Sequence, residues 1–315
     1  MSLRQIDEVP LYVMEFQGDY GFAEFLKTGA EDDSDIEKHV IRKILLGMDT
    51  FRLEEFNAAC TVFSAVNHEG ESIFARNFDF DFSPALLLYT NHPDGYASVS
   101  MVNLSYAGFN EERLPTPILN RFMLLGAPYI PFDGINEKGV SMALLSVPFT
   151  DPPYDEDKVT LNTTTVIRLV LDYAKDLDEA IFLLSQYNIY FSGGIDCHYL
   201  IADASGRSAV VEYFNGKMVV VPADQRWQTV SNFIISDPEK SGEGYCEVER
   251  FETVEQGLGA AGGILSETKA MSILKSVKIP GKTQWAVVYN QVTKEFILTM
   301  GGNYRTVYNY NLLSH

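Results

Sequence analysis

Residues 60–79 read CTVFSAVNHEGESIFARNFD, which has the pattern of two strands joined by a turn. The run Cys60–Val66 is apolar and rich in β-branched and aromatic side chains, and Ser72–Phe78 has the same character. Residues 67–70 between them are Asn-His-Glu-Gly, a composition typical of turns. The stretch therefore predicts an antiparallel β-hairpin.

This hairpin would bring a thiol close to two charged groups. Cys60 begins the first strand, and Arg76 and Asp79 lie near the end of the second, so the three meet at one end of the hairpin. A reactive cysteine needs a cationic neighbour, which Arg76 supplies, and a group that takes its proton. Cys60 would itself supply that base if the bond after Ala59 were cut, since an α-amine has a pKa of about 7.7–8.0. Asp79 would then orient the amine.

Two points compete with this interpretation. Most buried cysteines are inert, so Cys60 could be an ordinary core residue of an uncut chain. In addition, side chains three apart on a strand point to opposite faces, which separates Arg76 from Asp79. We therefore expect the strand to end or to bulge near Asn77 and Phe78.

The combination of Cys60 with Arg76-Asn-Phe-Asp79 resembles the choloylglycine hydrolase family of N-terminal-nucleophile hydrolases. That family includes bile salt hydrolases and penicillin V acylases, and it is related to acid-ceramidase-like amidases. The resemblance extends from Cys60 to about Asn309. It implies an α+β fold of four layers, the αββα sandwich with two packed antiparallel sheets, and chemistry that needs no cofactor. It also implies that the thiol itself attacks the preceding carbonyl, so that cleavage before Cys60 requires no other protease.

Further segments carry the same resemblance. Residues 132–140, FDGINEKGV, resemble a family turn that leads into a buried strand. Where bile salt hydrolases have a pocket asparagine after this strand, the matching residue is Ser146, which puts bile-salt specificity in doubt. Asn232 matches an asparagine that donates to the oxyanion, and Arg250 matches an arginine at the head of a helix that holds the active-site charges. The resemblance thus implies catalytic roles for Asn232 and Arg250 and substrate binding at Ser146.

Residues 1–59 form a long segment before the candidate nucleophile. We expect a strand over 10–16 and a helix over about 36–45, begun by a capping box of Ser34 and Glu37. The segment is therefore expected to fold. We interpret residues 1–59 as a propeptide or N-terminal segment and residues 60–315 as the catalytic domain.

Two other motifs suggest rival sites. Cys197 and His198 are the residue types of a thiol dyad, but neighbours on a strand point to opposite faces, so we expect them to pack in the core. Ser266 and Lys269 fit the Ser-x-x-Lys pattern of penicillin-binding enzymes without its partner motifs, so we interpret Ser266 as a helix N-cap. Cys246 is expected to be inert. No cluster has the spacing of metal ligands.

Composition sets outer limits on function. The chain has 315 residues, 46% of them hydrophobic, and a formal net charge of −19, which argues against nucleic acid as a partner. No apolar run is long enough to span a bilayer, residues 1–8 lack the apolar core of a signal peptide, and three cysteines do not indicate a disulfide framework. These features predict a cytoplasmic protein.

The sequence therefore predicts a cysteine hydrolase that cleaves linear, non-peptide C–N amide bonds after autoproteolysis before Cys60. The expected substrates are small N-acyl amides such as conjugated bile salts, penicillin V or fatty acid amides. Two alternatives remain open: an acyltransferase of the penicillin type, and an unprocessed, non-catalytic binding protein on the same fold. A homo-oligomer is compatible with the sequence, which does not determine the oligomeric state.

Overall fold

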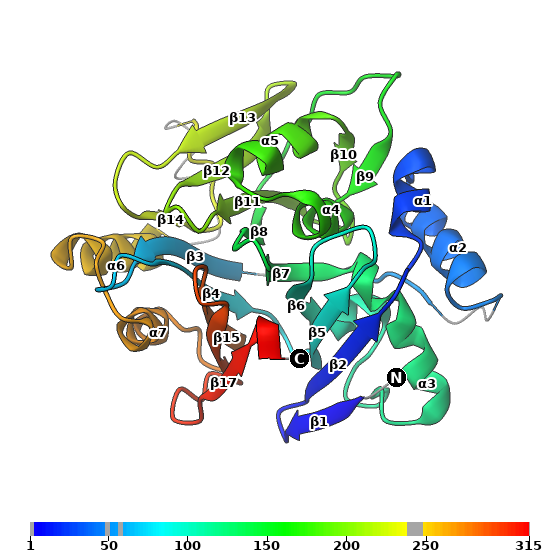
Figure 1. Ribbon diagram of the computed structural model, residues 1–315, viewed down its shortest axis with the longest axis horizontal. Coiled ribbons are helices and arrows are strands. Elements are labelled where there is room, and N and C mark those ends of the chain that lie inside the picture. Colours follow the sequence, from blue (N-terminus) through cyan, green and yellow to red (C-terminus); the bar gives the residue numbers. More distant parts are fainter. Residues whose placement is uncertain (1–2, 48–50, 56–58, 238–247, 315) are drawn as a thin grey trace.

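The computed structural model describes residues 3–47, 51–55, 59–237 and 248–314, and within them two large β-sheets lie between layers of helices (Figure 1). Strand β3 of the smaller sheet contacts β8 and β11 of the larger one, so the two sheets pack face to face. The predicted α+β class with packed antiparallel sheets is confirmed.

The larger sheet has nine strands within the described residues. In spatial order they are β1 (Arg4–Asp7), β2 (Leu11–Gln17), β5 (Ala85–Asn91), β6 (Ser98–Asn103), β7 (Pro131–Asn136), β8 (Ser141–Val147), β11 (Asp196–Ala202), β12 (Ser208–Phe214) and β13 (Lys217–Pro222). Every neighbouring pair is antiparallel except β2 and β5, which are parallel. A small separate sheet pairs β9 (Thr160–Asn162) with β10 (Asn188–Tyr190).

The smaller of the two main sheets has six strands in the described part of the chain, and all their pairings are antiparallel. In spatial order they are β14 (Gln228–Val230), β3 (Ala59–Val66), β4 (Ser72–Asp79), β15 (Thr283–Asn290), β16 (Glu295–Met300) and β17 (Tyr308–Asn311). The predicted hairpin is thus the pair β3–β4, and it lies inside this sheet.

The helices form the outer layers (Figure 1). Helices α4 (Thr165–Tyr173) and α5 (Leu177–Ser185) pack on the larger sheet, whereas α6 (Val248–Ala260) and α7 (Glu267–Ser276) pack on the smaller one. The remaining helical elements are α1 (Phe22–Thr28), α2 (Asp33–Lys43), α3 (Ile118–Met123), and the short 3-10 turns η1 (Leu104–Ala107), η2 (Leu124–Tyr129) and η3 (Leu312–Ser314). No helix in the described ranges has both the length and the apolar composition needed to cross a bilayer.

Alternation along the central hairpin separates two cores. On β3, Cys60 and Val62 join the core between the two sheets, whereas Phe63 and Ala65 join the core beneath α6 and α7. This is the period-2 pattern of a strand that is buried on both faces. Consequently, the parity of a residue number on β3 and β4 decides which core its side chain enters.

The N-terminal segment is an integral part of the larger sheet. Strand β2 pairs with β5 over its whole length, and Leu11, Tyr12 and Met14 are fully buried. Helix α2 begins after Asp32, whose side chain accepts from the backbone N–H of Asp35 at 3.1 Å, so the predicted Ser34 cap is wrong. The extended backbone at Asp32 suits an N-cap, whereas Ser34 already lies in the first turn.

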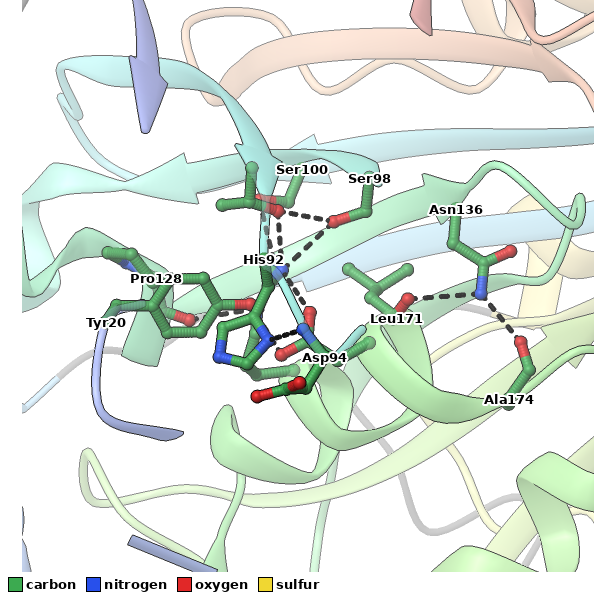
Figure 2. Close-up of polar contacts among 12 residues, drawn as sticks. Tyr20, His92, Asp94, Ser98, Ser100, Pro128, Asn136, Leu171 and Ala174 are labelled. Atoms are coloured by element: carbon green, nitrogen blue, oxygen red, sulfur yellow. Dashed lines mark hydrogen bonds and ion pairs between the residues drawn. The ribbon is translucent and has the colours of Figure 1, made fainter. Parts of the chain in front are cut away.

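A buried ion pair binds this segment to α4. Arg168 and Asp172, one turn apart on α4, are joined at 2.9 Å and are fully shielded from solvent. The hydroxyl of Tyr20, from the N-terminal segment, donates to Asp172 at 2.5 Å. Figure 2 shows Tyr20 of the N-terminal segment close to Ser98 and Ser100 of β6 and to Pro128 of η2, and the last three supply acceptors for the Arg168 guanidinium. The segment is thus held by polar contacts as well as by its strand.

Ser266 caps α7 as expected, with its side chain accepting from the Lys269 N–H at 3.2 Å.

Candidate active site

The hairpin places Cys60 and Arg76 on one face. Cys60 pairs with Phe78 across the hairpin, and Arg76 lies two residues before Phe78, so all three side chains point towards the larger sheet. The Arg76 Nη2 donates to the Cys60 Sγ at 3.1 Å, and both residues are fully buried. The expected contact between the thiol and a cation is therefore present in the uncut chain.

Arg76 is itself held by the larger sheet. Its Nη1 donates to the Asp133 carboxylate at 2.9 Å and to the Phe132 carbonyl at 2.6 Å. Asp133 also accepts from Trp285 at 3.1 Å and from the Tyr289 hydroxyl at 2.7 Å. These contacts fix the planar guanidinium and neutralise its charge inside the core.

Sequence reasoning missed Asp133. The residue lies in the segment 132–140 that resembles the family turn, but its role there depends on a contact with Arg76, 57 residues away. The sequence shows an aspartate followed by a glycine in a segment that resembles the family turn. The same pair of residues is common in turns that have only a structural role, so it did not single out Asp133.

Burial opposes activation of the thiol. It raises the pKa of Cys60 above the ordinary value, while Arg76 and the more remote Arg250 lower it and Asp79 raises it. The net direction is upward, so the arginine alone does not produce a thiolate in the uncut chain. A base beside the thiol is therefore needed, as the sequence argument requires.

Asp79 lies on the opposite face of β4, towards α6. It pairs with Ala59, the residue before the candidate scissile bond, and its carboxylate accepts from the Arg250 guanidinium and from the Thr283 hydroxyl. Burial raises the pKa of Asp79, and Arg250 and Thr283 oppose this rise. Arg250 also donates to the Val277 carbonyl at 2.8 Å, which anchors it beneath the hairpin.

The irregularity expected in β4 lies in its partner strand. The β3–β4 register runs without a shift from Val66 and Ser72 to Ala59 and Asp79, so the bulge predicted near Asn77 and Phe78 is wrong for this pair. The shift occurs instead on β15, between Thr283 and Trp285. Arg76 and Asp79 keep opposite faces, and each reaches the end of β3 from its own side.

Asn232 contacts the backbone nitrogen of Cys60. Its side-chain Oδ1 accepts from the Cys60 N–H at 2.7 Å, and its Nδ2 donates to the Ser146 carbonyl at 2.8 Å and hydroxyl at 2.9 Å. One neighbour is a backbone donor and the other a backbone acceptor, so the orientation of the amide is determined. The fold thus gathers all six candidate residues around the bond before Cys60: Cys60, Arg76, Asp79, Ser146, Asn232 and Arg250.

Cys197 and His198 do not form a dyad with each other. His198 directs its ring to Glu212 and to the Ser231 carbonyl, whereas Cys197 is fully buried opposite Ser146. Burial is the main cause that raises the pKa of Cys197 well above its ordinary value, and the neighbouring Cys60 is the second cause. A raised pKa is expected of an inert thiol. Cys246 lies outside the described residues.

A pocket of about 190 Å³ adjoins the site at Ser146. Its lining residues are Ser146, Val147, Pro148, Phe191, Gly194, Ile195 and Asp196. A β-carbon added to Gly194 would lie 3.3 Å from Glu55, so the N-terminal segment packs against the rim of this pocket.

The match to a family model and the fold define the class of protein. Residues 60–232 match the family model described as linear amide C-N hydrolases, choloylglycine hydrolase family. The chain belongs to this family, and the matched region contains the hairpin and ends at Asn232. The resemblance seen in the sequence is confirmed.

Solved structures share the fold. A variant of the conjugated bile acid hydrolase from Clostridium perfringens aligns with a TM-score of 0.60 and 16% identity, covering 81% of this chain and 93% of that one. Penicillin V acylase from Agrobacterium tumefaciens aligns with a TM-score of 0.56 and 19% identity, covering 81% and 86%. At such identities the likeness establishes the N-terminal-nucleophile hydrolase fold and leaves the substrate open.

Glu212 provides a test of how its buried charge, paired with His198, stabilises the protein. Burial alone would raise the pKa of Glu212, but His198, Ser236 and the backbone amide of Ile235 lower it from 4.5 to about 2. The ionised group therefore contributes about 3 kcal/mol of stability above its unfolded pKa, and this is lost as the pH falls through 2. We expect Glu212→Gln to lower the free energy of unfolding at pH 7 by about this amount, with the difference narrowing below pH 4.5. Urea denaturation at pH 7 and pH 3 measures it; a difference independent of pH would contradict the charge-based explanation.

Proposed function

We propose that this chain is an N-terminal-nucleophile cysteine hydrolase that cuts its own Ala59–Cys60 bond and then hydrolyses small N-acyl amides. The observation that carries the proposal is the separate support of the two reacting atoms of Cys60. Its Sγ faces Arg76 at 3.1 Å, and its backbone nitrogen faces Asn232 at 2.7 Å. A residue that must serve as nucleophile and as base needs both atoms held independently.

The first step converts the uncut chain into the enzyme. The Cys60 thiol attacks the Ala59 carbonyl carbon, the C–N bond breaks as the thiol proton passes to the Cys60 nitrogen, and water hydrolyses the resulting thioester. The products are a new carboxylate on Ala59 and a free α-amine on Cys60. The position of Asp79, paired with Ala59 and joined to Arg250, suits it to orient that amine.

The second step uses the new amine as a general base. It takes the thiol proton while Sγ attacks the substrate carbonyl, the amine product leaves, and water releases the acyl group. The Asn232 Oδ1 continues to accept a hydrogen bond from the amine of Cys60. Its Nδ2 stops donating to the Ser146 hydroxyl and donates to the developing oxyanion instead. Arg76, neutralised by Asp133, stabilises the thiolate.

Residues 1–59 are proposed to remain bound after cleavage. Strand β2 lies in the larger sheet and Tyr20 reaches Asp172, so cutting one peptide bond removes none of these contacts. A cleaved protein would therefore purify as one folded molecule, just as an uncut binding protein would. Only a measurement under denaturing conditions distinguishes the two.

The test of the proposal combines mass spectrometry with an amide panel. The denatured protein should give two masses, one from a fragment that begins with Cys60, and N-terminal sequencing should read Cys-Thr-Val-Phe. The processed protein should release amine from at least one of three substrates: a glycine-conjugated steroid acid, a phenoxyacetylated β-lactam and a long-chain fatty acid amide. An intact chain that releases no amine would overturn the proposal.

Asn232 variants separate the two roles assigned to this residue. Asn232→Ala should lower kcat by about 10²–10³-fold, the usual effect of losing an oxyanion donor. Asn232→Asp keeps an acceptor for the Cys60 nitrogen but cannot donate, so an equal loss would identify the oxyanion contact as the important one. Ser146→Ala, which leaves the contact between Asn232 and Cys60 intact, is the matched control and should lose much less. Steady-state kinetics on processed protein provide the measurement.

A further inference from the structure

His198 is a fully buried histidine with two defined partners. Its Nδ1 lies 3.1 Å from the Glu212 Oε1, and its Nε2 lies 2.9 Å from the Ser231 carbonyl oxygen. His198 and Glu212 are neighbours on β11 and β12, and both side chains are fully shielded from solvent. Ser231, in contrast, belongs to the loop that follows β14 in the other sheet.

Both ring nitrogens of His198 face oxygen atoms. The Ser231 carbonyl can only accept, so Nε2 must carry a proton. Glu212 accepts from the N–H of Ile235 at 2.7 Å through Oε1 and from the N–H of Ser236 at 2.9 Å through Oε2, so both of its oxygens act as acceptors. Nδ1 therefore faces a carboxylate oxygen, and the ring links Glu212 to the Ser231 carbonyl.

Together the two side chains hold both ends of one loop. His198 fixes the carbonyl of Ser231 at the start, and Glu212 fixes the amides of Ile235 and Ser236 at the end. Asn232 lies between these anchors. The Ser231 hydroxyl in addition donates to the Cys60 carbonyl at 3.1 Å, so the loop contacts Cys60 through two consecutive residues.

We propose that His198 and Glu212 are positioning residues that set Asn232 against the nitrogen of Cys60. The proposal rests on the hydrolase function proposed above. Beyond its contribution to stability, a buried pair with a defined partner at each ring nitrogen has a geometry that is well suited to fixing a loop. Here the pair lies directly behind the residue that must hold an amine and an oxyanion in place.

Kinetics on His198→Gln and Glu212→Gln test this role. A small displacement of a catalytic group can lower a rate by about 10²-fold, so each variant should lose about 10–100-fold in kcat with KM nearly unchanged, and should process the Ala59–Cys60 bond more slowly. Because the two residues act on one loop, the double variant should lose less than the product of the single losses. Tyr199→Phe is the matched control: it removes a buried hydrogen bond, to the Thr163 carbonyl at 2.9 Å, from the same strand, and should leave kcat unchanged.

The readouts separate a positioning role from a structural one. If the variants lose stability but their folded fraction turns over at the wild-type kcat, the proposal is overturned. If wild-type protein neither processes nor hydrolyses any amide, the proposed function fails and this inference fails with it. An active wild type with unaffected variants contradicts this inference alone.

Discussion

Cys60→Ala yields a single uncut chain that hydrolyses no amide, and this is the largest effect that we expect. The variant lacks the atom that attacks Ala59 and the atom that attacks substrate, so both steps lose their nucleophile. Arg76 and Asn232 keep their other partners, Asp133 and Ser146, so the site should keep its shape. The measurements are denaturing mass spectrometry and amine release.

Cys60→Ser is the matched variant. Its hydroxyl is almost the same size but is a much weaker nucleophile near neutral pH, so we expect slow processing and little turnover. Full activity of the serine variant would count against covalent catalysis by the thiol. A two-chain product from Cys60→Ala would show that another agent makes the cut.

Arg168→Met is expected to have the largest effect on stability. It leaves the Asp172 carboxylate buried, with the Tyr20 hydroxyl as its remaining side-chain hydrogen-bond donor among the described residues, and removing one partner of a buried ion pair typically costs about 3–5 kcal/mol. The guanidinium also donates to Thr90, Ser98, Ser100 and Pro128, so their acceptors lose a donor at the same time. The free energy of unfolding should fall accordingly.

The measurement is best made in the Cys60→Ala background, where every molecule is one chain. Lys38→Ala is the control, because Lys38 pairs with Asp35 on the surface and such pairs contribute about 0–1 kcal/mol. Equal, small losses from both variants would show that the buried pair does not stabilise the chain. In processed protein, Arg168→Met should also weaken retention of residues 1–59, since Tyr20 bonds to the now unpaired Asp172.

Local sequence patterns were sufficient to predict the two strands that position Cys60. The apolar runs on either side of the turn at 67–70 predicted β3 and β4. The hairpin register then places the side chains of Cys60 and Arg76 on the same face of the sheet. These features depend on neighbours that are close in sequence. The acidic run before α2 was also recognised as a helix start, although the capping residue is Asp32.

Contacts between distant parts of the chain were not predictable in the same way. The parallel pairing of β2 with β5, which makes the N-terminal segment part of the sheet, joins strands separated by the whole of α1, α2 and β3–β4. Asp133 could not be distinguished from a turn residue until Arg76 was seen beside it. His198 was expected to be packing because it lies on a strand; its partner, the Ser231 carbonyl, belongs to the loop after β14, 33 residues away in the chain.

The sequence by itself thus determined the fold class, the family and the residue types around Cys60. Strand periodicity and motif spacing are properties of short segments, so they can be read without knowing how the rest of the chain folds. Only the tertiary structure decided which carboxylate neutralises Arg76, which pair contacts both ends of the loop that contains Asn232, and how residues 1–59 join the larger sheet. Those answers depend on burial, because in a low-dielectric interior each charged group must find its partner wherever the packing of the two sheets places one.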